Sequence, residues 1–419
     1  MFKFIHAADL HIDSPLRGLD NYEGAPVEEI RAATRRALEN LVNLAIEEKV
    51  AFVLLAGDIY DGDWPDFNTG LFFIKQMAIL QSEGIKVFMV AGNHDANNKM
   101  TKKLRMPENV HMFSSKKPET FQIDELESAI HGQSFATVST SKNLATGYPT
   151  PINNYFNVGL LHASVDGREG HADYSPCTLD HLINKGYDYW ALGHIHKREV
   201  LNEEPMIVFP GNTQGRHAKE TGQKGCTLVT VKDRNVESAK HHCLDVLRWH
   251  SCEIDVSGVE NTEEIFGLLK DGLDKVLDET LECTLAVRVV VTGATKAHYD
   301  IHRDTDYFIN ECRAQVLSSV RKTIWVEKII LKTFPPVNTD DNVEDQDLIQ
   351  RILQRIEEFS SNEELEKIIN QLAEFKRKLP PEISQGDEPF DLSDPEIIKE
   401  ILKDAGNLIC GKLTGSESV

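Results

Sequence analysis

The chain has 419 residues, of which 41% are hydrophobic and 27% are charged. This length predicts two or three domains, and the composition is typical of an ordinary globular protein in water. No stretch of the sequence approaches the ~20 consecutive apolar residues that a transmembrane helix requires, so we do not expect an integral membrane protein.

The start of the chain and the cysteines point to a cytoplasmic location. Met1 runs directly into a predicted strand, and Asp9 comes too early for the apolar region of a signal peptide. The seven cysteines are odd in number, widely scattered and without a CxxC pair. This usage favours reduced thiols over a disulfide framework or a structural zinc site.

The formal net charge of −22 argues against strong autonomous binding to nucleic acid, because proteins that bind phosphates are usually basic. The charge is unevenly distributed. From Pro336 to Val419 there are 20 acidic and 9 basic residues, so this fifth of the chain carries −11, half of the total. Metal ions would neutralise further carboxylates. The charge therefore does not exclude DNA as a substrate.

Five short apolar runs each lead to residues that can bind a metal ion. The runs are four to six residues long, β-branched or aromatic, and bounded by Gly, Asp or His, which is typical of strands buried on both faces. In open α/β sheets the chemistry collects just beyond the carboxyl ends of such strands. One His at a strand end would be an ordinary structural residue, but five coincidences predict a site. The runs and the residues after them are Phe2–Ala7 with Asp9 and His11, Phe52–Ala56 with Asp58 and Asp61, Val87–Ala91 with Asn93, His94 and Asp95, Val158–Leu161 with His162, and Tyr189–Leu192 with His194 and His196.

The segments between the first strands have the helical period. Val27–Glu47 and Phe67–Gln81 place apolar residues on one side and charged residues on the other. The alternation of strands and helices predicts a largely parallel sheet covered by helices. We expect Ile207–Pro210 and Cys226–Val231 to extend a second sheet. The fold class is therefore α/β, with a layered sandwich of two sheets flanked by helices.

The predicted pattern of strands and helices changes after about Val246. Cys252–Val256, Leu285–Val291 and Ile324–Leu331 are predicted strands separated by helices, as in a small α+β domain. Pro335 and Pro336 open a linker, and the tail that follows reads as amphipathic helices. We expect domains at residues 1–245, 246–335 and 336–419. The helical positions in the tail are Ile349, Ile352, Leu353 and Ile356, then Leu365 to Phe375 behind a capping box at Ser361 and Glu364, then Ile397, Ile398, Ile401 and Leu402.

The polar residues at the strand ends have a composition suited to metal ions. Carboxylate, imidazole and amide oxygen together favour two divalent ions such as Mn²⁺ or Fe²⁺. The set has no thiolate, which argues against a structural zinc site. Glycines precede Asp58, Asn93 and His194, where they permit tight turns close to the ions.

The order Asp9-x-His11, Gly57-Asp58-x-x-Asp61, Gly92-Asn93-His94-Asp95, His162, Gly193-His194-x-His196 resembles the calcineurin-like metallophosphoesterase superfamily over roughly the first 235 residues. The resemblance implies a two-metal hydrolase of phosphate esters with the layered α/β-β/α fold. It also implies the ligands of each ion. Asp9, His11 and His196 would hold one ion, Asn93, His162 and His194 the other, and Asp58 would bridge them.

His94 has a different implied role. In the family the corresponding residue stabilises the transition state and protonates the leaving oxygen, work that suits an imidazole near neutral pH. Asp61 would orient His94, although some nuclease relatives carry His at that position. For Asp95, a direct role and a structural capping role remain open.

Four segments resemble the SbcD-type DNA repair exonucleases, and within them the YhaO-like bacterial subgroup: Lys3–His11, Val53–Asp61, Asp188–Lys197 and Phe209–Thr230, where a strand turns through Pro210-Gly211-Asn212 toward Glu220. This likeness implies DNA as the substrate, a cap domain after Val246, and a coiled-coil ATPase of the SbcC type as partner. A homodimer is also compatible with it. The helices from Val343 to Leu379 could dock that partner or simply pack on their own domain.

The sequence is also compatible with other functions. The chain could hydrolyse a smaller phosphoester, such as a cyclic nucleotide or a phosphoprotein, or could be a non-enzymatic scaffold. The cap and the extra helices disfavour a small substrate, and the complete set of ligands disfavours a scaffold. Loop residues Arg168, His171, Arg216 and His217 could touch substrate phosphates or be solvated.

Overall fold

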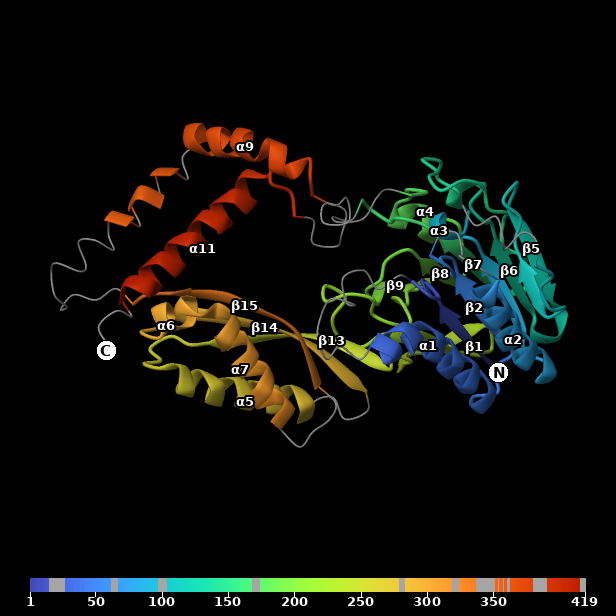
Figure 1. The fold of residues 1–419 in the computed structure, drawn as a ribbon. Helices are drawn as coiled ribbons and strands as arrows, with labels where there is room; N and C mark the ends of the chain where they lie inside the picture. The colour runs from blue at the N-terminus through green and yellow to red at the C-terminus, as the bar shows by residue number, and fades with distance from the viewer. Residues whose placement is uncertain are drawn as a thin grey trace. The chain divides into compact units, whose positions relative to one another are not determined.

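The computed structural model describes residues 1–14, 27–61, 67–96, 104–167, 174–278, 283–318, 324–336, 351–352, 354–356, 358–359, 362–379 and 390–414. These residues form two compact units, with the change from the first to the second between Trp249 and His250. Each unit has its own sheet or sheets and its own hydrophobic core (Figure 1).

The first sheet of the first unit has six strands in the order β12-β11-β1-β2-β3-β4. The central strands β1 to β4 run parallel, whereas β11 pairs antiparallel with β1, and β12 with β11. Buried strands linked by helical crossovers are expected to pair in this parallel way. The strands are β1 (Phe2–Ala7), β2 (Phe52–Ala56), β3 (Lys86–Val90), β4 (Val110–Met112), β11 (Gly225–Lys232) and β12 (Asn235–Cys243).

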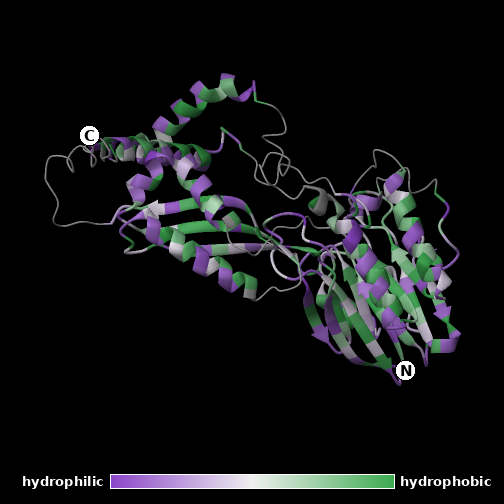
Figure 2. Ribbon diagram, turned by 60° about the horizontal axis from the view of Figure 1, so that its bottom comes forward, coloured by the Kyte–Doolittle hydropathy of each residue, from purple (hydrophilic) through white to green (hydrophobic). Residues whose placement is uncertain are grey.

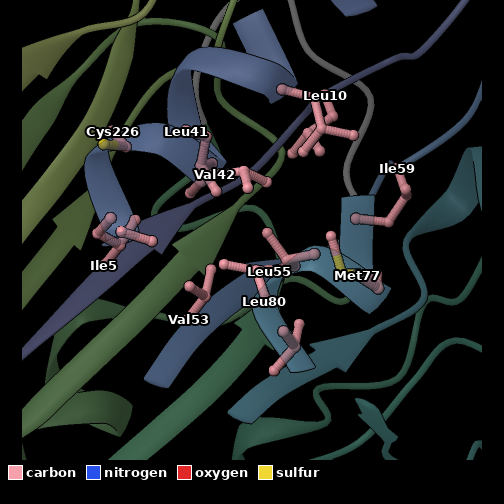
Figure 3. Packing of buried hydrophobic residues seen from close by; sticks show 14 of the residues in the cluster. Ile5, Leu10, Leu41, Val42, Val53, Leu55, Ile59, Met77, Leu80 and Cys226 are labelled. Atoms are coloured by element: carbon pink, nitrogen blue, oxygen red, sulfur yellow. The ribbon is translucent and has the colours of Figure 1, made fainter. Parts of the chain in front are cut away.

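Two helices connect the first three strands and pack against this sheet. They are α1 (Val27–Glu47) and α2 (Asn68–Ser82), close to the predicted bounds. Their apolar residues recur every three or four positions, so one face of each helix is buried. Figure 3 shows this packing, with Leu41 and Val42 of α1 and Met77 and Leu80 of α2 in one cluster with Ile5, Val53 and Leu55 of the strands.

The second sheet also has six strands, in the order β5-β6-β7-β8-β10-β9. Its four middle strands are parallel, and the two edge strands are antiparallel to their neighbours. A short helix, α4 (Leu179–Ile183), packs on its outer side, where Leu182 contributes to a cluster around Trp190. The strands are β5 (Glu119–Ile123), β6 (Ser128–Gly132), β7 (Phe156–His162), β8 (Tyr189–Gly193), β9 (Glu199–Glu203) and β10 (Met206–Phe209).

An apolar layer rich in aromatic rings joins the two sheets. The rings of Phe4 and Phe52, from the first sheet, stack with their centroids 5.0 Å apart. Tyr189, from the second sheet, meets Phe4 edge-on at 5.2 Å. All of these residues are fully buried. The α/β-β/α sandwich predicted from the sequence is therefore confirmed.

One strand lies in a different sheet from the one expected. Ile207–Pro210 corresponds to β10 of the second sheet, but the prediction that Cys226–Val231 extends that sheet is wrong. These residues belong to β11, which pairs with β1 through Ile5 and Leu228. A strand buried on both faces has the same apolar pattern in either sheet. Its pairing partner depends on the path of the chain between strands, which the local pattern does not encode.

The second unit is built on a three-stranded sheet of β13 (Leu247–Asp255), β14 (Thr284–Ala294) and β15 (Ile324–Phe334), with β14 in the middle. The helices α5 (Thr262–Asp278) and α7 (Thr305–Ser318) contribute Leu269 and Phe308 to its core. The predicted α+β character of this region is therefore correct. Figure 2 shows helices that mix hydrophobic and hydrophilic residues, as expected when one face is buried.

The tail helices belong to the second unit. They are α9 (Asn362–Lys376) and α11 (Pro395–Thr414), and α11 packs on α6 (His298–Arg303). Asn407 Oδ1 lies 3.2 Å from His298 Nε2, and the Gly411 carbonyl accepts from Arg303 Nε at 3.2 Å. The predicted division into separate domains at 246–335 and 336–419 stays a prediction. Ile349, Leu353 and Ser361 lie outside the described residues.

In the part of the chain that the structure describes, no helix is both long enough and apolar enough to cross a membrane.

Replacing Leu55 with Ala should destabilise the first unit. Leu55 is fully buried between the strands and helices of its core, so the substitution should lower the free energy of unfolding by about 3 kcal/mol. Leu71→Ala is the matched control. Because Leu71 is 54% exposed, this substitution should change the free energy of unfolding by less than about 0.5 kcal/mol. Calorimetric melting of both variants would measure this. Equal effects would contradict the placement of this core.

Candidate metal centre

The predicted site residues converge at the carboxyl ends of five strands of the first unit. These are β1, β2 and β3 of one sheet and β7 and β8 of the other. The loops after β1 and β2 run side by side, because Asp9 N–H donates to the Gly57 carbonyl and His11 N–H to the Asp58 carbonyl, both at 3.0 Å. Two sheets thus present their polar strand ends to one space.

The backbone at the site adopts conformations that side chains rarely accept. Asp9, His11 and Asp58 have φ angles of 53°, 43° and 50°, and His194 has 111°. Each such residue costs on the order of 1–3 kcal/mol, and such strain clusters at functional sites. Gly193 is needed for a different reason, since a Cβ there would lie 1.9 Å from the Ala56 carbonyl oxygen.

The first group of donors consists of Asp9, His11 and His196. One ligand atom from each lies within 4.8 Å of the others. The Nε2 atoms of the two imidazoles face each other at 3.2 Å. The Asp9 carboxylate also accepts the backbone N–H of His194, at 3.0 and 3.1 Å to its two oxygens.

The second group consists of Asp58, His162 and His194, again within 4.8 Å. His162 Nδ1 lies 2.8 Å from the Ala56 carbonyl oxygen. A carbonyl can only accept, so Nδ1 carries a proton and Nε2 is the nitrogen that is left to bind a cation. That atom lies 3.0 Å from Asn93 Oδ1 and 3.4 Å from Asp58 Oδ2, so in the metal-free protein it can carry a proton, which a bound cation would displace.

His94 and Asp61 lie beside these groups. His94 Nδ1 is 2.7 Å from Asp61 Oδ1, and the Ser14 hydroxyl donates to Asp61 Oδ2 at 2.8 Å. The hydrogen bond to Asp61 raises the pKa of His94, although burial opposes it. The His94 side chain is 41% exposed, whereas that of His162 is 1% exposed, so a substrate could reach His94 directly.

The electrostatics of the site are those of buried carboxylates facing imidazoles. Burial raises the pKa of Asp9. At Asp58, burial also favours the neutral acid, but His162 and the neighbouring histidines outweigh it and lower the pKa. For His162, burial is outweighed by Asp58, which raises the pKa to about 9. Oxygen and nitrogen donors that are buried and convergent in this way fit divalent cations, which would stabilise the same carboxylates.

Asp95 has a structural role. Its carboxylate accepts the backbone N–H groups of Ile59 and Tyr60, after β2, and of Gly92, after β3, at 3.0 to 3.2 Å. Burial and the nearby Asp58 raise its pKa to about 6. Of the two roles left open by the sequence, the structure favours the capping one, because Asp95 ties two of the site's loops together.

Glu220 lies in the segment Phe209–Thr230 that resembles the SbcD-type exonucleases, but the sequence did not indicate a role for it. It lies between β10 and β11, and its Oε1 is 2.6 Å from His196 Nδ1. Its Oε2 accepts from Asn212 Nδ2 and from the backbone N–H of Arg216, both at 2.8 Å. A histidine that binds a metal usually donates its other N–H to a carboxylate, so a search for acidic residues after the strand next to β8 would have found Glu220.

Two of the four predicted loop residues lie at the site. Arg216 Nη1 is 3.5 Å from Asp61 Oδ2, and His217 Nε2 is 3.4 Å from Glu220 Oε1. Arg168 and His171 lie outside the described residues. Arg216 and His217 thus face carboxylates that hold site histidines.

Comparison with protein families finds a match in each unit. Residues 2–198 match the family model described as calcineurin-like phosphoesterase. Residues 249–334 match the model described as metallophosphoesterase YhaO, middle domain.

Three relatives illustrate the similarity. The chain is 38% identical to the uncharacterized metallophosphoesterase YhaO of Bacillus subtilis (strain 168) over 294 residues, which cover 69% of this chain and 71% of the relative. It is 23% identical to a subunit of the nuclease SbcCD from Staphylococcus saprophyticus, covering 56% of this chain and 67% of the relative. It is 22% identical to the DNA double-strand break repair protein Mre11 of Methanopyrus kandleri, covering 51% of this chain and 49% of the relative.

Glu220→Gln should weaken metal binding. The substitution removes the charge that holds His196 Nδ1, and such supporting groups typically contribute about 10- to 100-fold to metal affinity. Calorimetric titration with Mn²⁺ would measure the change. Glu237→Gln is the control, because the Glu237 side chain is 46% exposed on β12 and pairs with Lys232. An unchanged Mn²⁺ affinity in the Glu220 variant would show that Glu220 does not support the site.

Proposed function

The chain belongs to the calcineurin-like metallophosphoesterases and is YhaO-like, and from this premise we propose that it is a two-metal-dependent phosphodiesterase that cleaves DNA as the nuclease subunit of a repair complex. The observation that carries the proposal is the convergence of the two donor groups, with His94 exposed beside them. A binding protein without catalysis would not need an accessible imidazole held by a carboxylate next to such groups.

We propose that Asp9, His11 and His196 hold one divalent ion and that Asn93, His162 and His194 hold the other, with Asp58 shared. The burial of Asp58 and its 3.4 Å distance to His162 support this assignment. Bound ions of this kind polarise a phosphoryl oxygen and acidify a water molecule. Mn²⁺ and Fe²⁺ suit the mixture of imidazole, carboxylate and amide ligands.

His94 is the proposed acid of the reaction. Asp61 engages Nδ1 and fixes the ring, so Nε2 is the nitrogen left to stabilise the phosphoryl group and to deliver a proton to the leaving oxygen. Ser14 holds the second oxygen of Asp61, which limits rotation of the carboxylate. The residues of this chain thus position the proton at a defined atom beside the metal donors.

The choice of DNA as substrate rests on relatives. One relative is part of the nuclease SbcCD, and another is a DNA double-strand break repair protein. The match of residues 249–334 to a YhaO middle domain adds a unit that hydrolysis of a small ester would not require. The net charge of −22 favours the second candidate, an esterase for a smaller phosphodiester, because an acidic protein repels a polyanion.

We also propose a coiled-coil ATPase partner of the SbcC type. Two observations support this partner. The relative from Staphylococcus saprophyticus is a subunit of the nuclease SbcCD, and this chain has an acidic helical tail. Leu365 of α9 packs with Leu392 and Ile398 of the same unit, whereas Phe375 of the same helix is 57% exposed, so docking of the partner by the helices from Val343 to Leu379 stays a prediction. The packing of Leu365 agrees with the alternative, in which these helices pack on their own domain. A homodimer and a cytoplasmic location stay predictions.

Two substitutions should separate metal binding from proton transfer. His94→Gln should keep both ions and lower kcat on a model phosphodiester by about 10²- to 10⁴-fold, the usual contribution of a positioned acid or base. Asp58→Asn should lose the ions and the activity together, because Asp58 faces both donor groups. Elemental analysis beside kinetics would decide this. Loss of metal from the His94 variant would mean that His94 is a ligand.

DNA cleavage should depend on metal and on salt. Linear DNA should be degraded with Mn²⁺ at low ionic strength, more slowly as salt rises because phosphate contacts release counterions, and not at all after chelation. Asp58→Asn, purified in the same way, controls for contaminating nucleases. If cyclic nucleotides or phosphopeptides are turned over while DNA stays intact, alone and with the ATPase, the small-substrate candidate replaces the nuclease.

A further inference from the structure

Two histidines of the site are held in the same way, each by one carboxylate at Nδ1. His94 Nδ1 is 2.7 Å from Asp61, and His196 Nδ1 is 2.6 Å from Glu220. The carboxylates come from different loops, after β2 and after β10. In both pairs the bond at Nδ1 leaves Nε2 as the working nitrogen.

Arg216 lies between these two carboxylates. Its Nη1 is 3.5 Å from Asp61 Oδ2 and its Nη2 is 3.6 Å from Glu220 Oε1. Nη1 also lies 3.5 Å from the Ser14 hydroxyl, which itself donates to Asp61. The two arms of one guanidinium therefore face the supports of two different histidines.

The loop that carries Arg216 is fixed by buried contacts. Gln214 accepts the backbone N–H of Val246 at 3.0 Å, and the Gly215 carbonyl accepts from Trp249 Nε1 at 3.1 Å. The backbone N–H of Arg216 is bound by Glu220 Oε2 at 2.8 Å. The guanidinium is thus placed by the loop, and its side chain is only 17% exposed.

We propose that Arg216 is a positioning residue that couples Asp61 to Glu220 and so keeps both His94 and His196 aligned. A guanidinium suits this role because it stays charged and its planar fork offers two separate arms in a fixed geometry, whereas the ammonium group of a lysine is a single point charge. The proposal deepens the proposed function and rests on it for the roles of His94 and His196. It differs from the phosphate contact considered from the sequence, because the arms of Arg216 face protein carboxylates.

The test compares Arg216→Met and Arg216→Lys with Arg36→Met, which changes an exposed arginine of α1. For a model phosphodiester with Mn²⁺, kcat should fall about tenfold in Arg216→Met with little change in KM, the lower end of the effect of groups that orient metal-binding histidines. Arg216→Lys should not restore kcat, and Arg36→Met should match the parent protein.

A second readout does not depend on activity. In metal-free protein labelled with ¹⁵N-histidine, the Nδ1–H protons of His94 and His196 should exchange faster with solvent in Arg216→Met. The Nδ1–H of His162 should be unchanged, because it is bonded to the Ala56 carbonyl, and it serves as an internal check that the site is folded. Asp61→Asn and Glu220→Gln assign the two signals. With both carboxylates replaced, adding Arg216→Met should have little further effect, since coupled residues are not additive.

Two outcomes would overturn the proposal. A raised KM with unchanged kcat and unchanged histidine signals, restored by Arg216→Lys, would mean that Arg216 binds the substrate phosphate. If neither kcat nor the exchange of the histidine protons changes, Arg216 does not position the two histidines. If the parent protein cleaves neither the model ester nor DNA, the proposed function fails, whereas the histidine signals still decide the role of Arg216.

Discussion

The site depends on polar contacts that cross from one sheet to the other. The Ala56 carbonyl, at the end of β2, meets His162 of β7, and the Asp9 carboxylate, after β1, binds the N–H of His194 after β8. These groups are buried, so leaving any one without its partner would cost about 1–3 kcal/mol. The aromatic layer around Phe4 and Phe52 fixes the separation of the sheets. The apolar core thereby sets the geometry of the chemistry.

Backbone strain and the burial of several carboxylates make the site unfavourable without a bound cation. The backbone is strained at Asp9, His11 and Asp58, and their side chains are buried together. Such an arrangement persists only when the surrounding structure determines it. Divalent ions would offset the repulsion between the carboxylates, and the Nε2 atoms of His11 and His196, 3.2 Å apart, could both turn a lone pair to such an ion. The same features that destabilise the bare protein therefore prepare it for metal.

The sequence could predict the strand ends but not the loop that supports them. Asp9, Asp58, Asn93, His162 and His194 follow buried strands, and parallel strands bring their carboxyl ends to one edge. The contacts of Glu220 and Arg216 with His196 and Asp61 could not be predicted, because they depend on how a buried loop folds back on the strand ends. The sheet that β11 joins was unpredictable for the same reason, since a doubly buried run does not encode its partner.

The position of the negative charges matters more for binding an anionic substrate than the net charge of the whole chain. Half of the −22 lies beyond residue 335, in the tail of the second unit. In the first unit, the acidic residues Asp9, Asp58, Asp61 and Glu220 lie together at the candidate metal centre, beside the histidines that they contact. A phosphodiester would be repelled by these carboxylates in the bare protein, even with Arg216 beside them. Divalent ions bound at the candidate centre would offset these negative charges, so attraction for an anionic substrate would depend on metal binding as well as on composition.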